Sequence, residues 1–328
     1  MDQTKIYDIA GLAGVSLATV SRVSNHPEKV KKATRDRVLK IIKEQAYKPN
    51  ANARGLASRK STTVAVVVPT LKRASIGESI QGIDDSAKQY GYTIRLFIND
   101  EQGDEKDLWS EVIASSVDGI LFMNDEMSDY VFSLIENTPV PIVFVNAISK
   151  NKKFGSVSID NIKCAYEVTK QMIEKGNKDI LFVTTTKDYA INDLKVQGYE
   201  KAMKEAGLTP EVFKSTGVLT TNEQQYKEYL SKKIPDVALV VRDSMAISFM
   251  NTATNMGIKV PDQLQVIGFQ NTRYALLSNP QLTCVDNPVY EVGSLAMSKL
   301  TELMSDTEDT KPERLEVSYN IQWRGSTK

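Results

Sequence analysis

Short apolar runs alternate with stretches of helical periodicity from Thr62 onward, and this alternation limits the possible folds more than any other feature of the chain. The apolar runs are Val64–Pro69, Thr93–Ile98, Gly119–Met123 and Ile142–Val145, and the candidate helices lie near Glu78–Gln89, Glu105–Ser115 and Asp129–Glu136. Uninterrupted apolar strands separated by helices are typical of a parallel sheet covered on both faces. The sequence therefore predicts a doubly wound α/β lobe.

The same rhythm begins again after Asp160. We expect helices over 161–175, 191–206, 223–232 and 244–256, and strands over 180–184, 237–241 and 264–269. A second series of this kind predicts a second, similar lobe. Because ligands bind beside the carboxyl ends of parallel strands, the groove between two such lobes is the natural place for a small-molecule site.

The first 60 residues differ from this body in charge. They carry 13 Lys and Arg against 5 Asp and Glu, whereas the remaining 268 residues carry 28 against 36. The net charge of zero therefore conceals a head of about +8 and a body of about −8. Such polarity indicates a basic module for a polyanion joined to a domain with another ligand, although a merely soluble basic surface would give the same count.

Residues 6–23 have the pattern of two short helices joined by a tight turn. Apolar side chains recur at helical spacing at Ile6, Ile9, Ala10 and Ala13. Gly14 ends this helix, and Ser16 can cap the next one. A third helix over 34–45 would close a small core. The sequence predicts a helix-turn-helix head.

The second head helix would leave a set of mostly small side chains facing outward. They are Leu17, Ala18, Ser21, Arg22 and Asn25. Small and hydroxyl side chains let a helix approach base edges closely, and Arg22 can bridge O6 and N7 of guanine. The pattern favours a DNA-reading helix, although a helix pair packed on another domain would show similar periodicity.

Several blocks of the head resemble those of lactose-repressor-type (LacI/GalR) bacterial transcription regulators. The blocks are Ile6-Tyr-Asp-Ile-Ala, Gly14-Val-Ser, Thr19-Val-Ser-Arg-Val, Tyr47-Lys-Pro-Asn and Ala51-Asn-Ala-Arg-Gly-Leu-Ala. The resemblance covers essentially the whole chain, weakens in the body, and looks strongest to the carbon-catabolite regulators of this family. It implies a homodimeric repressor on a pseudo-palindromic operator. The expected DNA contacts are Lys5, Tyr7, Ser16, Leu17, Ala18, Thr19, Ser21, Arg22, Asn25, His26, Tyr47, Asn50, Ala53, Arg54 and Leu56.

Residues 49–60 would link the head, residues 1–48, to the body, residues 61–328. Pro49 cannot lie inside the preceding helix, and a helix as short as this linker is marginal in water. We therefore expect it to become helical only on DNA. The resemblance implies a hinge helix in the minor groove, with Leu56 as an apolar wedge; a flexible tether is the alternative.

The resemblance also implies the boundaries of the two lobes, which would be arranged as in periplasmic binding proteins. A final helix from about Tyr290 to Met304 and strands through Val317–Trp323 are expected to return to the first lobe. Lobe one would then comprise about residues 61–160 and 289–328, and lobe two about residues 161–288.

Polar residues that close the predicted strands are candidates for contacts with an effector in the cleft between the lobes. They are Asn124, Asn146, Asp160, Arg242, Asp243, Gln270 and Asn271, to which the resemblance adds Lys195. Gln270 stands where the family usually has Asp after Ile-Gly-Phe. A neutral amide cannot accept the hydroxyl protons of a sugar as a carboxylate does, which argues against a simple sugar inducer. The small-molecule candidates are a sugar and a sugar phosphate.

For the carbon-catabolite regulators, the resemblance implies a corepressor that docks on lobe one, the serine-phosphorylated phosphocarrier protein HPr of the sugar phosphotransferase system. The candidate contacts are Tyr290, Glu291, Ser298, Lys299 and Glu302. The family has basic residues where this chain has Ser298 and Glu302, and neither side chain can grip a phosphate as arginine does. Lys299 points about 100° away around the helix. We expect control by phosphorylated HPr, and the alternative is a LacI-type repressor controlled by a small molecule in the cleft.

Enzymatic functions find little support in the sequence. The one histidine, His26, follows the second head helix, and there is no glycine-rich phosphate loop, metal-ligand spacing or nucleophile with a matching base. Cys164 and Cys284 are expected to be packing thiols. No apolar run approaches the roughly 20 residues that span a bilayer, and the N-terminus has no signal-peptide core. We expect a cytoplasmic protein without a cofactor or a metal.

Overall fold

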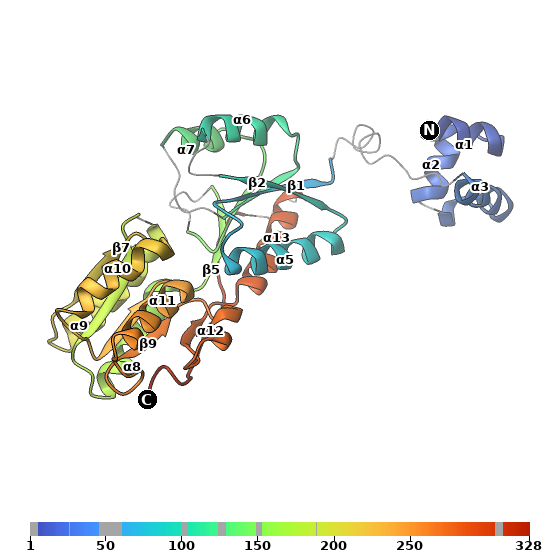
Figure 1. Cartoon of the computed structure of the whole chain (residues 1–328). Helices are drawn as coiled ribbons and strands as arrows, with labels where there is room; N and C mark the ends of the chain where they lie inside the picture. Colours follow the sequence, from blue (N-terminus) through green and yellow to red (C-terminus); the bar gives the residue numbers. More distant parts are fainter. Residues whose placement is uncertain are drawn as a thin grey trace. The chain divides into compact units, whose positions relative to one another are not determined.

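The computed structural model describes residues 6–25, 27–45, 61–99, 104–123, 129–148, 153–187, 189–305 and 311–328. The chain divides into two compact units, Met1–Thr62 and Thr63–Lys328 (Figure 1). The boundary between them falls at the end of the predicted linker, whose residues lie outside the described part.

The head is a bundle of three short helices. Its elements are α1 (Ile6–Ala13), α2 (Leu17–Asn25), a 3₁₀ turn (Pro27–Lys29) and α3 (Lys32–Glu44). Its core consists of Ile9, Ala10, Ala13, Val20, Val23 and Val38, all buried. Of the apolar positions that the sequence indicated on α1, Ile9, Ala10 and Ala13 lie in this core and Ile6 packs against it.

The turn between α1 and α2 has the chemistry expected of a helix-turn-helix. Gly14 adopts a positive φ of 60°, which a residue with a Cβ adopts only with strain. Ser16 then caps α2, because its Oγ accepts the backbone N–H of Thr19 at 3.2 Å. The chain bends by 103° between the two helices, within the range of the helix-turn-helix motif.

Lobe one is built on a six-stranded parallel sheet. Its strands, in spatial order, are β11 (Arg314–Glu316), β5 (Gly155–Ser158), β4 (Ile142–Val145), β3 (Gly119–Phe122), β1 (Thr63–Val68) and β2 (Thr93–Ile98). Its helices are α5 (Ala74–Gln89), α6 (Glu105–Ala114), α7 (Asp129–Glu136) and α13 (Val289–Met304). Residues alternate along β1 between two separate cores, one under α5 and α13 and the other under α6 and α7 (Figure 1). The doubly wound prediction is confirmed.

Lobe two repeats this architecture with one antiparallel strand. Its strands, in spatial order, are β12 (Asn320–Gln322), β10 (Thr283–Asp286), β9 (Gln265–Gly268), β8 (Val237–Val240), β6 (Ile180–Thr185) and β7 (Glu211–Ser215). Its helices are α8 (Asn161–Glu174), α9 (Ala190–Glu205), α10 (Leu219–Leu230), α11 (Asp243–Asn255) and α12 (Arg273–Leu277). Helix α8 packs on α9, and α10 packs on α11. The chain passes between the lobes after β5, β10 and β11.

The expected path of the C-terminus needs a correction. Helix α13 returns to lobe one as expected, but β12, the strand within the predicted range, pairs antiparallel with β10 in lobe two. The strand that pairs with β5 in lobe one is β11, which lies just before that range. The Oγ of Ser326, near the C-terminus, also accepts the backbone N–H of Thr283 and donates to the carbonyl of Val266. Residues 320–328 therefore belong to lobe two and not to lobe one, because their backbone partners are strands of the second sheet.

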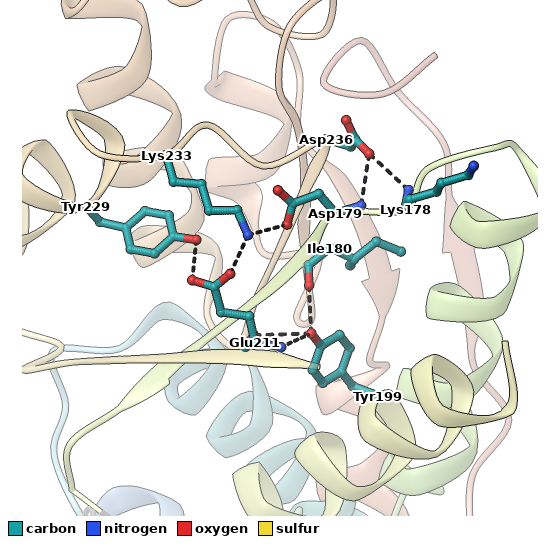
Figure 2. Close-up of polar contacts among 8 residues, drawn as sticks. All are labelled: Lys178, Asp179, Ile180, Tyr199, Glu211, Tyr229, Lys233 and Asp236. Atoms are coloured by element: carbon teal, nitrogen blue, oxygen red, sulfur yellow. Dashed lines mark hydrogen bonds and ion pairs between the residues drawn. The ribbon is translucent and has the colours of Figure 1, made fainter. Parts of the chain in front are cut away.

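A polar cluster fixes the edge strand β7 of lobe two (Figure 2). The Nζ of Lys233 lies 2.8 Å from a carboxylate oxygen of Asp179 and 2.6 Å from one of Glu211. The hydroxyl of Tyr229 donates to the other oxygen of Glu211 at 2.8 Å. The buried hydroxyl of Tyr199 donates to the carbonyl of Ile180 and accepts the backbone N–H of Glu211. These contacts tie β7 to α9, α10 and β6 where the strands begin.

Both cysteines are free and buried, as expected of packing thiols. Burial raises the pKa of the Cys164 thiol to about 12, so this thiol stays protonated. None of the described helices is by itself long and apolar enough to cross a membrane; the strongly bent pair α1 and α2 passes that test only when counted together.

Candidate nucleic-acid interface and inter-lobe cleft

Helix α2 presents a narrow outward face in the head. Ala18, Ser21 and Arg22 are exposed and follow one another at i, i+3 and i+4, which places them on one side of the helix. Thr19 is half-buried, and Leu17 packs partly against the head core. Tyr7, on α1, is 69% exposed. The side chains available for base contacts are thus small, hydroxyl-bearing or cationic, as expected for a helix in the major groove.

Several predicted DNA contacts lie outside the described residues. They are Lys5, His26, Tyr47, Asn50, Ala53, Arg54, Leu56 and the side chain of Asn25. The hinge-helix hypothesis stays a prediction.

A cavity of about 80 Å³ lies between the two lobes, at the carboxyl ends of their strands. Lobe one contributes Pro69, Arg73, Ser75, Ile76, Ser79, Met123, Val145, Asn146 and Val289, lobe two contributes Tyr189, Ile191, Asn192, Lys195, Val241, Arg242 and Gln270, and Asn287 lies on a connection between them. We call this cavity the cleft. Four of the predicted effector residues line it: Asn146, Lys195, Arg242 and Gln270.

Three cationic side chains line the cleft, and the described residues of its lining include no carboxylate. Arg73 precedes α5 in lobe one, whereas Lys195 lies on α9 and Arg242 precedes α11 in lobe two. Lys195 is only 5% exposed, and its Nζ lies 5.6 Å from the ring centroid of Phe269. A site of this composition favours an anionic ligand.

Side chains of the two lobes also touch across the cleft. The guanidinium of Arg73 donates to the hydroxyl of Tyr189 at 3.0 Å. The amide of Gln270 donates to the Oγ of Ser75 at 3.3 Å. Both contacts join the start of α5 to lobe two, so they depend on the relative position of the lobes.

Two buried polar atoms of the cleft lining have no hydrogen-bond partner among the described residues. They are the Oγ of Ser79 and the Oδ1 of Asn287, in side chains that are 1% and 5% exposed. An unpaired buried polar atom is costly, so both atoms favour a ligand or water that supplies the missing bond.

The other predicted effector residues do not line the cleft, and for three of them the expectation needs correction. Asp160 caps α8 by accepting the backbone N–H of Lys163 at 2.9 Å. Asp243 is fully buried, and its carboxylate accepts hydrogen bonds from the backbone N–H and the hydroxyl of Thr272. Asn271 accepts a bond from Arg324 at 2.7 Å. Each position follows a strand, but its polar atoms form hydrogen bonds with residues of lobe two. Asn124 lies outside the described residues.

Sequence reasoning missed Arg73 and Tyr189, which precede helices instead of directly following strands. Pro69, at the end of β1, could have signalled a turn whose next residues face the cleft. No comparable signal marks Tyr189, whose role depends on contact with a residue more than a hundred positions away.

The predicted corepressor surface lies on α13, beside α5 (Figure 1). Tyr290 is 42% exposed and donates its hydroxyl to Asp85 at 3.0 Å, and Glu291 is exposed. The Oγ of Ser298 lies 2.9 Å from the hydroxyl of Tyr90.

Lys299 is not available to a phosphate on that surface. Its side chain is 7% exposed, and its Nζ lies 3.2 Å from Glu302 and 2.6 Å from Glu313. Burial alone would lower the pKa of Lys299, but the hydrogen bonds to Glu313 and Glu302 more than offset this and raise it. The lysine is therefore charged and engaged within the protein.

A second, larger hollow lies on lobe two, away from the cleft. It has a volume of about 530 Å³ and is lined by residues of α10, α11 and α12 with their flanks. Two apolar side chains of its lining are strongly exposed, Leu219 at 58% and Leu277 at 77%. Leu276, the neighbour of Leu277 on α12, is 54% exposed. We call this surface the apolar groove. An exposed apolar patch of this kind is typical of an interaction surface. No group of three or more His, Cys, Asp or Glu within the described part of the chain is placed to hold a metal ion.

Comparison with known proteins assigns the family. Residues 5–50 match the family described as bacterial regulatory proteins, lacI family, and residues 169–327 match the periplasmic binding protein-like domain. Catabolite control protein A of Priestia megaterium is 36% identical over 98% of this chain and 99% of its own length. The chain belongs to the LacI family of bacterial regulatory proteins. It is a DNA-binding regulator of transcription that resembles catabolite control proteins, and these relatives are not enzymes.

Solved structures of other regulators are also similar to this LacI-family chain. The transcription regulator CcpA of Lactococcus lactis is 28% identical, with a TM-score of 0.72 over 81% of this chain and 99% of its own. The lac repressor dimer bound to operator and the anti-inducer ONPF is 23% identical, with a TM-score of 0.90 over 99% of both chains, and supports the fold alone.

Proposed function

We propose that this LacI-family regulator acts as a homodimer on a pseudo-palindromic operator of carbon-catabolism genes, and that an anionic small molecule in the cleft sets its DNA affinity. The observation that carries the effector proposal is the convergence of Arg73, Lys195 and Arg242 on a cavity whose described lining has no carboxylate. A regulator of bacterial operators acts where the DNA is, so the protein is cytoplasmic.

The head accounts for recognition of the major groove. Helix α2 exposes Ala18, Ser21 and Arg22 along one side, so its backbone can approach base edges while Arg22 donates two bonds to guanine. The segment over 49–60 supplies contacts in the minor groove at the centre of the operator, with Leu56 as the wedge. Replacing Leu56 by Ala weakens operator binding and reduces DNA bending; unchanged bending in a circular-permutation gel assay refutes the wedge.

The apolar groove supports the dimer. A palindromic site requires two heads related by a two-fold axis, and a two-fold interface uses the same surface on both chains. Leu219, Leu276 and Leu277 are strongly exposed apolar side chains that would be buried in such a contact. Leu277→Glu therefore gives monomers in sedimentation velocity, whereas Ile113→Glu, at an exposed position of lobe one, leaves the dimer intact.

The cleft favours a phosphorylated sugar over a free one. The cationic side chains offer charge-assisted hydrogen bonds to a phosphate. The unpaired Oγ of Ser79 and Oδ1 of Asn287 can bond to hydroxyl groups. Gln270, in place of a carboxylate, removes the strongest acceptor for the hydroxyls of an uncharged sugar. The effector contacts both lobes and so shifts the population able to bind DNA.

HPr phosphorylated on serine is the second candidate modulator, and the likeness to catabolite control proteins favours it. The surface of α13 argues against it, because Ser298 offers one hydroxyl, Glu302 is an acid and Lys299 is engaged internally. A phosphoserine finds no free guanidinium or ammonium among these positions.

Selection of bound fragments from random DNA tests the proposal. The purified protein is used alone, with hexose phosphates, with the matching free hexoses, and with HPr in phosphorylated and unphosphorylated form. The proposal expects one palindromic motif whose recovery changes only with hexose phosphates. An effect of phosphorylated HPr alone overturns the effector assignment, and the absence of any palindrome overturns the operator assignment.

A further inference from the structure

Tyr189 occupies the point where the lobes face each other across the cleft. It is the residue before α9 in lobe two, and its side chain is only 7% exposed. Most of its described polar and ring contacts involve cationic side chains. Its surroundings therefore differ from those of a tyrosine that merely fills a core.

Lobe one contacts the ring through Arg73. The guanidinium donates to the tyrosine hydroxyl at 3.0 Å, and its Cζ lies 5.4 Å from the ring centroid. The same guanidinium thus makes a hydrogen bond and a cation–π contact, each favourable when water is excluded. Both contacts are lost if the lobes separate, because Arg73 and Tyr189 belong to different lobes.

Lobe two contacts the ring through Arg242 and Lys187. The Cζ of Arg242 lies 5.3 Å from the ring centroid, and the Nζ of Lys187 lies 5.6 Å from it. Gly217 makes room for the arginine, since a Cβ there would lie 3.2 Å from its Nη1. The ring of Tyr189 consequently holds one guanidinium from each lobe.

Tyr189 lines both the small cleft and a larger hollow beside it. A volume of about 80 Å³ is well below the several hundred Å³ of a typical ligand site. Tyr189 lines, in addition, a neighbouring hollow of about 260 Å³ between α9 and strands β6 and β7. The ring therefore has space into which it can turn when it leaves Arg73.

We propose that Tyr189 is a latch that holds the lobes together in the absence of an effector, by clasping Arg73 of lobe one and Arg242 of lobe two. An anion that enters the cleft competes with the ring for the guanidiniums of Arg73 and Arg242. Its contacts with the two arginines then replace their contacts with Tyr189. This role deepens the proposed function, since it describes how the same cleft is regulated. The latch itself requires neither effector nor DNA.

Pulsed electron–electron double resonance on the full-length protein tests the latch. Spin labels are attached to cysteines introduced at Asp107 in lobe one and Lys232 in lobe two, both exposed, and labelled protein is diluted with unlabelled protein. Cys164 and Cys284 are fully buried and take up no label. Without ligand, the protein with an unaltered latch gives one narrow distribution of distances between the two labels.

Variants on both sides of the clasp give graded results. Tyr189→Leu raises a second distance population by on the order of tenfold, because it loses the hydroxyl and the ring. Tyr189→Phe keeps the ring and gives an intermediate population. Arg73→Met, on the other lobe, reproduces Tyr189→Leu and remains informative if the substituted tyrosine destabilises the fold.

Tyr166→Leu is the matched control. This tyrosine also has a hydrogen-bonded hydroxyl and neighbouring lysines, but all its partners lie in lobe two. The control leaves the distribution unchanged. Distributions that are also unchanged in both Tyr189→Leu and Arg73→Met overturn the latch. If the variants behave as expected but no anionic ligand changes operator affinity, the proposed function is overturned and the latch stands.

Discussion

The buried carboxylate of Asp243 accepts hydrogen bonds from the backbone N–H and the hydroxyl of Thr272, at 2.6 and 2.9 Å. Asp243 begins α11 and Thr272 precedes α12, so this contact joins two helices that line the apolar groove. The same carboxylate accepts the backbone N–H of Gln270, whose side chain lines the cleft. Burial raises the pKa of Asp243, while the bonds from Thr272 and Gln270 oppose that rise. One side chain thus positions part of the cleft and part of the apolar groove.

Removing this carboxylate is expected to be costly. Asp243→Ala leaves the buried N–H and hydroxyl of Thr272 without an acceptor and lowers the free energy of unfolding by about 3 kcal/mol. Urea unfolding followed by circular dichroism measures the change. Asp262→Ala, at an exposed position of the same lobe, changes it by less than about 0.5 kcal/mol. Equal effects of the two substitutions contradict the role assigned to Asp243.

The crossing of α5 and α13 depends on a glycine. A Cβ at Gly82 would lie 2.0 Å from the carbonyl oxygen of Tyr290, whereas a Cβ at Gly77, on the same helix, would meet nothing within 4 Å. Gly82→Ala therefore destabilises the protein by about 3 kcal/mol through overpacking. Gly77→Ala stabilises it by about 0.5–1 kcal/mol, because alanine favours the helix. Thermal unfolding of the pair gives shifts of opposite sign; shifts of one sign exclude the close crossing.

The polar cluster of β7 gives a pH dependence (Figure 2). Burial alone would raise the pKa of Glu211, but the hydrogen bonds from Lys233 and Tyr229 lower it below its usual value. A lowered folded-state pKa adds stability that is present above the ordinary glutamate pKa of about 4.3 and is lost as pH falls through the folded value. The side chain is 37% exposed, so screening limits the gain to about 1 kcal/mol.

Glu211→Gln isolates this contribution. The difference in unfolding free energy from the unaltered protein is largest at pH 7 and shrinks as the pH falls below about 4. Urea unfolding of the variant and the unaltered protein, at pH 7 and again below about pH 4, measures this difference. A difference that grows on acidification contradicts the assignment.

Arg22 is expected to carry base specificity in the head. Arg22→Ala weakens binding to the selected operator by about 1–3 kcal/mol and relaxes the preference at one base pair in each half-site. Lys40→Ala, on α3 with a side chain that is 76% exposed, removes the same charge away from α2 and serves as the control. Fluorescence anisotropy with single-base operator variants measures both. A uniform loss on every sequence would assign Arg22 to the phosphate backbone.

The sequence predicted the fold where burial determines it. Strands such as β1 and β4 are continuous apolar runs, because helices cover both faces of each sheet. Strands β5, β7, β10 and β11 were missed. Their segments mix small, polar and charged residues with apolar ones: Gly155–Ser158, Glu211–Ser215, Thr283–Asp286 and Arg314–Glu316. Their strand state depends on pairing with distant segments, which local periodicity does not contain.

The cleft was predicted less completely than the fold. The rule that ligands bind at strand ends correctly selected Asn146, Arg242 and Gln270 as residues of its lining. It also selected Asp243, because a polar residue that caps a loop occupies the same kind of position as one that faces a ligand. Tyr189 was missed because its partners come from another lobe.

Titration of operator affinity with a hexose 6-phosphate tests the central claim most directly. The selected operator is labelled, and its dissociation constant is measured against the hexose phosphate and the matching free hexose, for the unaltered protein and for Arg242→Met. The account predicts a change of at least about fivefold with the phosphate, none with the free sugar, and a much smaller change in Arg242→Met. Equal responses to both sugars, or an unchanged response in Arg242→Met, would contradict control by an anion in the cleft.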